Sequence, residues 1–157
     1  MNRVGLMFLC MSLALAFIAG TVIQGANAAS GSPCRDVQQF AKVMPRGFKT
    51  TVDLNGESFE PEDVIAFKIA NVGSVAVSYG EETRVDVFDG AGWIPASAFP
   101  PIRVEKRVGR LDPGETGMCE QLKIPSTTPA GKYRIEKQVR PIFGKHWRRI
   151  TATFRVT

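Results

Sequence analysis

Residues 64–71 read Val-Ile-Ala-Phe-Lys-Ile-Ala-Asn, and this stretch decides the fold class. Large apolar side chains occupy every second position, at Ile65, Phe67 and Ile69, with small or polar residues between them. Successive side chains of an extended strand point to opposite faces. The alternation therefore predicts a β-strand with one buried face rather than a helix.

The same alternation returns along the rest of the chain. Further strands are predicted at residues 75–79, 84–88, 102–108, 118–124, 133–136 and 150–156. Turn-forming Gly, Pro, Asn and Asp recur between them at intervals of about ten residues, which is typical of an all-β sandwich or barrel. No segment after Gly47 shows a sustained helical period.

Three turn motifs resemble those of bacterial Ig-like domains of secreted proteins and lipoproteins. They are Asp89-Gly90-x-Gly92-Trp93, Leu111-x-Pro113-Gly114-Glu115 and Pro129-Ala130-Gly131-Lys132-Tyr133-Arg134-Ile135, and a Phe-x-Val strand ends the chain. The resemblance covers residues 48–157 and implies an immunoglobulin-like β-sandwich of the Greek-key type. Its Gly-Lys-Tyr element resembles a tyrosine corner, in which the phenol bonds to nearby backbone. These motifs occupy turns and core positions, so no ligand is carried over.

The first residues predict export. Arg3 precedes an apolar run from Val4 to Ile23, and Ala26 and Ala28 supply the small residues of a signal-peptidase site. We expect cleavage after Ala28 and a periplasmic or extracellular location, with no membrane span in the mature protein. The alternative is an uncleaved anchor, since about twenty apolar residues can cross a bilayer. The predicted parts are a signal peptide (1–28), an N-terminal segment tied down by a disulfide (29–47) and the sandwich domain (48–157).

Two cysteines, Cys34 and Cys119, follow the predicted cleavage site. An even pair in an exported protein predicts a disulfide, which in the chain-entropy model is worth about 4–5 kcal/mol for a loop of this length. Leu122 and Ile124 are predicted to point inward, which places Cys119 on the opposite face of its strand. The bridge should therefore lie outside the sandwich.

The sequence predicts no enzyme and no catalytic residue. Its one histidine, His146, lies among basic and aromatic residues, which is a poor setting for a general base. Nucleophile, zinc-protease and phosphate-loop motifs are absent from the sequence. Residues 53–57 (Asp-Leu-Asn-Gly-Glu) offer oxygen ligands that suit Ca²⁺, but their spacing does not fit an EF-hand, and Asn-Gly is a hairpin signal. We predict a turn there, no metal site and no cofactor, with calcium as the open alternative.

Charge is the most informative functional feature. Residues 53–90 carry nine acidic side chains against two basic ones, whereas residues 132–155 carry eight basic side chains against Glu136 alone. We expect the last hairpin to present a basic surface with aromatic residues near its tip. The candidate binding residues are Lys132, Arg134, Lys137, Arg140, Phe143, Lys145, His146, Trp147, Arg148 and Arg149.

Together these features predict a non-enzymatic exported module that binds a protein or an anionic cell-envelope polymer through the basic C-terminal hairpin. Export argues against nucleic acid as the partner. Two alternatives stay open. The charged segments can neutralise each other within the fold, or the domain can be a structural or inhibitory module that works through an edge strand or the Pro-rich loop at residues 98–102.

Overall fold

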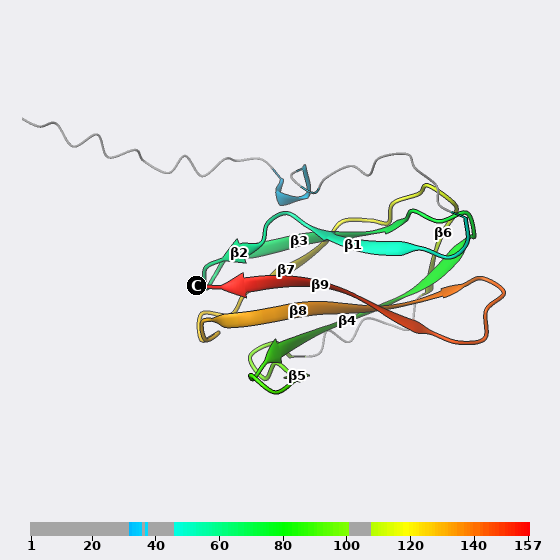
Figure 1. Ribbon diagram of the computed structural model, residues 1–157. Coiled ribbons are helices and arrows are strands. Elements are labelled where there is room, and N and C mark those ends of the chain that lie inside the picture. The colour runs from blue at the N-terminus through cyan, green and yellow to red at the C-terminus, as the bar shows by residue number, and fades with distance from the viewer. Residues whose placement is uncertain (1–31, 36, 38–45, 101–107) are drawn as a thin grey trace, which may run out of the picture. The chain divides into compact units, whose positions relative to one another are not determined.

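Two β-sheets form the sandwich in the computed structural model, which describes residues 32–35, 37, 46–100 and 108–157 (Figure 1). The predicted signal peptide and most of the predicted strand at 102–108 lie outside these residues. The elements are η1 (Pro33–Arg35), β1 (Thr50–Leu54), β2 (Ser58–Phe59), β3 (Val64–Asn71), β4 (Val77–Phe88), β5 (Trp93–Pro95), β6 (Val108–Leu111), β7 (Glu120–Lys123), β8 (Gly131–Pro141) and β9 (Arg148–Val156).

The first sheet has the strand order β1-β3-β7, with antiparallel pairs. Ile65, Phe67 and Ile69 of β3 are buried in the core, as their alternation predicts. The opposite face differs from the prediction, because Ala66 and Ala70 are buried as well. The short turn η1 lies against β3 on the side away from the second sheet, so small side chains on that face are covered by chain (Figure 1).

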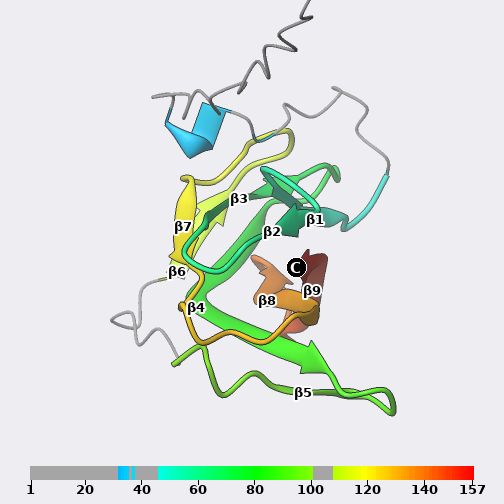
Figure 2. The ribbon, with the colours of Figure 1, turned by 90° about the vertical axis from the view of Figure 1, so that its left-hand side faces the viewer.

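The second sheet has the order β2-β9-β8-β4-β5, and β6 also pairs with β4. Figure 2 shows it as a separate layer from β1, β3 and β7. The strands predicted at 75–79 and 84–88 form one strand, β4, whose register with β8 shifts between Tyr79 and Thr83. The prediction of a break there was wrong because β4 passes the intervening Gly80 with this irregularity instead of turning.

The chain changes sheets between β1 and β2, where the sequence predicts a hairpin turn. Asn55 continues the β1–β3 ladder, because its side-chain oxygen accepts from Ala66 N at 2.9 Å and its amide donates to Val64 O at 3.3 Å. After Glu57 the chain pairs with β9 in parallel, at Ser58–Phe59. The Asn-Gly pair thus marks a crossing between layers.

Aromatic side chains fill the core between the layers. Phe154 lies 5.6 Å from Tyr133 and 6.0 Å from Phe59, measured between ring centroids. The Tyr133 hydroxyl donates to Pro129 O at 2.7 Å, which confirms the tyrosine corner. Burial raises the pKa of this phenol.

Cys34 and Cys119 are joined, with 5.9 Å between their Cα atoms. Cys34 lies on η1, and Gln121 of β7 donates from Nε2 to its sulfur at 3.4 Å. Since η1 lies on the outer side of the first sheet, the bridge is outside the sandwich, as the strand parity of Cys119 predicts. The disulfide fastens the segment before β1 to the sandwich.

Candidate binding surface

The loop between β8 and β9 holds a tight turn at its tip. Gly144 N donates to Pro141 O at 2.8 Å, and Ile142 N donates to Ala76 O at 3.0 Å, which ties the loop to the β3–β4 connection. A Cβ atom on Gly144 would approach Pro141 Cδ to 2.9 Å, so the turn requires glycine here. Phe143 occupies the third position of this turn, and 98% of its side chain is exposed.

Basic and aromatic residues surround the tip. Lys145, His146, Arg148 and Arg149 are all exposed. The guanidinium carbon of Arg140 lies 4.6 Å from the centroid of the Trp147 ring. We name the set Arg140, Phe143, Lys145, His146, Trp147, Arg148 and Arg149 the hairpin tip. No acidic residue follows Glu136 in the sequence, so the hairpin tip has a cluster of positive charge with no carboxylate of its own.

Lys137 does not belong to this surface, and its prediction as a binding residue was wrong. Its side chain is 0% exposed between the sheets, and its ammonium donates to Glu120 Oε2 at 2.8 Å and to Thr83 Oγ1 at 3.0 Å. Alternation explains the position, because Lys137 has the same parity on β8 as the buried Tyr133 and Ile135. The sequence prediction counted its charge and overlooked that parity.

Arg134 is largely engaged within the sheet. Its Nε and Nη2 atoms donate to Asp86 Oδ2 at 2.9 and 2.8 Å, and its guanidinium carbon lies 4.7 Å from the centroid of the Trp93 ring. Arg149 Nε lies 3.3 Å from Glu136 Oε1. Some basic side chains are therefore neutralised within the fold, Arg134 by Asp86 of the neighbouring strand β4 and Arg149 by Glu136 of β8.

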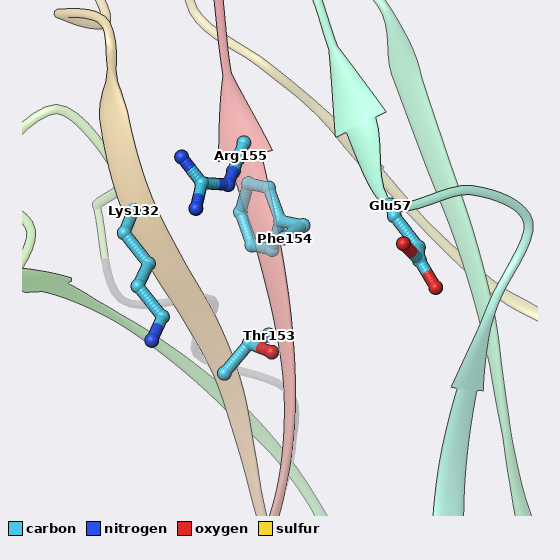
Figure 3. A pocket seen from close by; sticks show the side chains of 5 residues that line it. All are labelled: Glu57, Lys132, Thr153, Phe154 and Arg155. Carbon is cyan, nitrogen blue, oxygen red and sulfur yellow. The ribbon is translucent and has the colours of Figure 1, made fainter.

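Lys132 lies at the start of β8, away from the hairpin tip. Its ammonium nitrogen is 5.7 Å from the centroid of the Trp93 ring. With Glu57, Thr153, Phe154 and Arg155 it lines a shallow, open depression of about 280 Å³ (Figure 3). Lys132 and Arg155 lie on one side of β9 in this view, and Glu57 lies on the other. Of the ten predicted residues, the hairpin tip keeps seven, of which Arg149 is paired with Glu136. Arg134 is paired with Asp86, Lys137 is buried and Lys132 is distant.

A second surface, which the sequence did not locate, runs along the edge of β9. Among the described strands this edge is paired only at Arg155 and Val156, by β2, which leaves residues 148–154 open. Facing it, β1 pairs only with β3. Residues 52–57 together with Ala152 and Thr153 line a depression of about 330 Å³ between these two edges.

Residues 53–57 were considered above as possible calcium ligands. No group of three or more His, Cys, Asp or Glu side chains is arranged to hold a metal ion within the part of the chain that the structure describes. Asn55 already uses both side-chain polar atoms on the backbone of β3. Burial raises the pKa of Asp53, because its charged form loses solvation. Over the described ranges, no helix has the length and apolar character needed to cross a bilayer.

The family described as "Bacterial Ig-like domain" matches residues 47–155. No curated protein sequence matches this chain. The comparison with solved structures gives matches of low identity. A family 123 glycoside hydrolase from Clostridium perfringens has a TM-score of 0.39 and 10% identity, over 70% of this chain and 27% of the hydrolase.

Two further structures have similar scores. The sporulation control protein Spo0M from Bacillus subtilis has a TM-score of 0.40 and 14% identity, over 69% of this chain and 49% of its own. A PapD-like domain of human CEP192 has a TM-score of 0.34 and 17% identity, over 94% of both chains. The chain spans less than half the length of the hydrolase and of Spo0M.

Proposed function

Because this chain belongs to the bacterial Ig-like domain family, we propose that it is a non-enzymatic, exported binding module whose hairpin tip contacts an anionic partner. One observation carries the proposal. The hairpin tip gathers exposed basic and aromatic side chains on a hydrogen-bonded turn, in a stretch of sequence with no acidic residue. Clustered charge of one sign raises the local concentration of oppositely charged partners and speeds their association.

Export is part of the same proposal. The Cys34–Cys119 bridge fits an oxidising compartment, since such bonds persist outside the cytosol. The apolar leader and the small residues that end at Ala28 supply the expected route. The mass of the secreted protein tests both features, because cleavage after Ala28 fixes the mature N-terminus at Ala29. Free thiols in a protein that retains residues 1–28 would contradict export.

Charge reversal at the hairpin tip tests the binding role. The variant Lys145→Glu/Arg148→Glu should bind a soluble polyanion such as dextran sulfate far more weakly than the natural protein. The matched control is Lys132→Glu/Arg155→Glu, which changes the net charge equally on exposed residues of β8 and β9 away from the hairpin tip. Titration at several salt concentrations reports the electrostatic share of binding. Equal losses in both variants, or binding that salt does not weaken, would show that the hairpin tip is not the contact.

The open edge of β9 favours a second candidate function, in which the domain works through strand addition. An unpaired edge presents N–H and C=O groups that an added strand can pair. Arg155 N donates to Glu57 O and Thr157 N to Phe59 O. Because these groups alternate in direction along a strand, the amides of the odd-numbered residues, including Thr151 and Thr153, face the open edge.

A pair of proline variants separates this function from damage to the fold. Thr151→Pro removes an amide that faces the open edge, whereas Ala152→Pro removes one that faces β8. A labelled peptide of residues 51–57 is a suitable probe, because extending the β2–β9 register places that sequence opposite residues 148–154. Thr151→Pro should abolish peptide binding with little loss of stability, and Ala152→Pro should unfold the domain. Unchanged peptide binding by Thr151→Pro would rule out the edge.

A further inference from the structure

Phe143 is the most exposed large apolar side chain among the described residues. Phe143 lies in the turn from Pro141 to Gly144, which is closed by a backbone hydrogen bond of 2.8 Å. The neighbouring bond from Ile142 N to Ala76 O fixes the turn against the β3–β4 connection. The fold therefore presents the exposed phenyl ring of Phe143 on a turn whose backbone is fixed by hydrogen bonds.

Exposed apolar surface near Phe143 is not confined to its ring. Val75 lies in the connection that accepts the Ile142 hydrogen bond, and its side chain is 37% exposed. Trp147 is 39% exposed beneath the guanidinium of Arg140. Lys145 and Arg148 are exposed on either side of Trp147 in sequence. Exposed apolar and basic side chains therefore occur together at the hairpin tip.

These features distinguish between possible anionic partners. A soluble polyanion needs only the cations and leaves a projecting phenyl ring in water. A rigid protein partner buries such a ring only if it has a matching pocket. A fluid lipid surface accepts a convex apolar tip without a preformed pocket, its anionic headgroups attract Lys and Arg, and indole rings favour the interface.

We propose that the hairpin tip is a peripheral docking site for an anionic lipid bilayer. Phe143 enters the boundary between headgroups and acyl chains, Lys145 and Arg148 contact lipid phosphates, and Trp147 lies at headgroup depth. This inference rests on the proposed function, because it names an anionic membrane surface as the partner of the same site.

The two tryptophans make the test direct, because Trp147 belongs to the hairpin tip and Trp93 lies on β5. In a Trp93→Phe background, all indole fluorescence comes from Trp147. Vesicles of phosphatidylglycerol and phosphatidylethanolamine should shift this emission to the blue, and acyl-chain-brominated lipids should quench it. Vesicles of phosphatidylcholine alone should do neither. Absence of the shift and of the quenching with anionic vesicles would overturn the proposal.

Substitution of Phe143 separates insertion from charge attraction. Phe143→Ser should weaken vesicle binding by about tenfold or more, since burial of a Phe side chain is worth about 1.5–3 kcal/mol and 1.4 kcal/mol is a factor of ten. Phe143→Trp should restore binding. The control Phe88→Ser changes a ring that is 41% exposed at the β4–β5 turn and should leave binding unchanged. Equal vesicle affinity of the natural protein and Phe143→Ser would refute insertion.

The outcomes separate this inference from the function on which it rests. If the natural protein binds dextran sulfate in a manner sensitive to Lys145→Glu/Arg148→Glu but brominated lipids leave Trp147 unquenched, membrane docking fails and the polyanion-binding function stands. If neither vesicles nor dextran sulfate bind, both fail. Since Phe143 is almost fully exposed, its variants should melt at the temperature of the natural protein.

Discussion

Replacing Asn71 with leucine is expected to destabilise the domain by about 3–5 kcal/mol, because three backbone groups lose their partner. The Asn71 amide donates to Val75 O at 3.0 Å and to Leu111 O at 3.2 Å, and its oxygen accepts from Gly73 N at 3.2 Å. The side chain is fully buried. Asn71 thus joins the end of β3, the β3–β4 connection and β6.

The magnitude follows from the surroundings of each group. The bonds to Leu111 O and from Gly73 N are buried, and an unsatisfied buried backbone group costs about 1–3 kcal/mol. Val75 O is only part-buried and can turn to water, so it adds less. Leucine has the branching of asparagine and a larger volume, so no cavity contributes. A loss of this size should lower Tm by on the order of 10–20 °C.

Urea unfolding of the natural protein and of Asn71→Leu, followed by intrinsic fluorescence, measures the effect. A loss below about 1 kcal/mol would refute the reasoning, because surface substitutions alone give changes of about 0.5 kcal/mol. Asn71→Asp supplies a second measurement. It keeps the acceptor for Gly73 N but turns a carboxylate towards two carbonyl oxygens, which raises the pKa of the new carboxyl. Its stability should therefore rise as pH falls through that raised pKa, and the gain should be complete below the pKa of the unfolded chain.

Three further predictions concern other parts of the fold. Reduction of the Cys34–Cys119 bridge should cost about 4 kcal/mol, measured by urea unfolding with and without reductant, and equal midpoints would contradict it. Because burial raises the pKa of Asp53, its charged form opposes folding above that pKa. Asp53→Asn should therefore melt at least as high as the natural protein at neutral pH, and the difference should vanish as pH falls to 3.8, the ordinary pKa of an aspartate side chain. Glu120→Ala should cost about 3–5 kcal/mol, because it removes the Glu120 carboxylate from the buried Lys137 ammonium, whereas Lys137→Met should cost far less. Equal losses in calorimetry would contradict this prediction.

The sequence predicted the features that depend on local alternation and turn chemistry. Period-two spacing places Ile65, Phe67 and Ile69 in the core, and strand parity places Cys119 on the outside. The tyrosine corner at Tyr133 follows from a motif with a local hydrogen bond. Each of these features is decided within a few residues of chain, which is why sequence alone was sufficient.

Features that depend on which strands become neighbours were not predictable in the same way. The change of sheet at Asn55 uses the side chain to bond β3, a partner that no local pattern identifies. The continuity of β4 past Gly80 depends on its pairing with β6 and β8. Lys137 is buried in the core where Glu120 of the other sheet reaches its ammonium. Pairing between distant segments decides all three.

Strand pairing also explains why the hairpin tip, and not the whole basic segment, keeps its positive charge. Along β8, the register places Arg134 opposite Asp86 of β4 and Glu136 opposite Arg84, so charges of opposite sign meet within the sheet. Towards the tip, beyond the register shift, Arg140 lies opposite Ser78 and Pro141 opposite Val77, which carry no charge. Beyond Pro141 the hairpin has no paired strand of the acidic segment beside it.

Asp86 of β4 thus neutralises Arg134 of β8 before the hairpin begins. Lys145 and Arg148 are exposed near Phe143, at the other end of the hairpin. A substitution that moves an acid towards that end should therefore weaken binding without contact with the partner. Ser78→Asp, opposite Arg140, is such a change, and Ser97→Asp in the connection after β5 is a control of equal charge. If both variants lower the affinity for anionic vesicles equally, overall net charge and not the local pairing of β4 with β8 sets the potential at the hairpin tip.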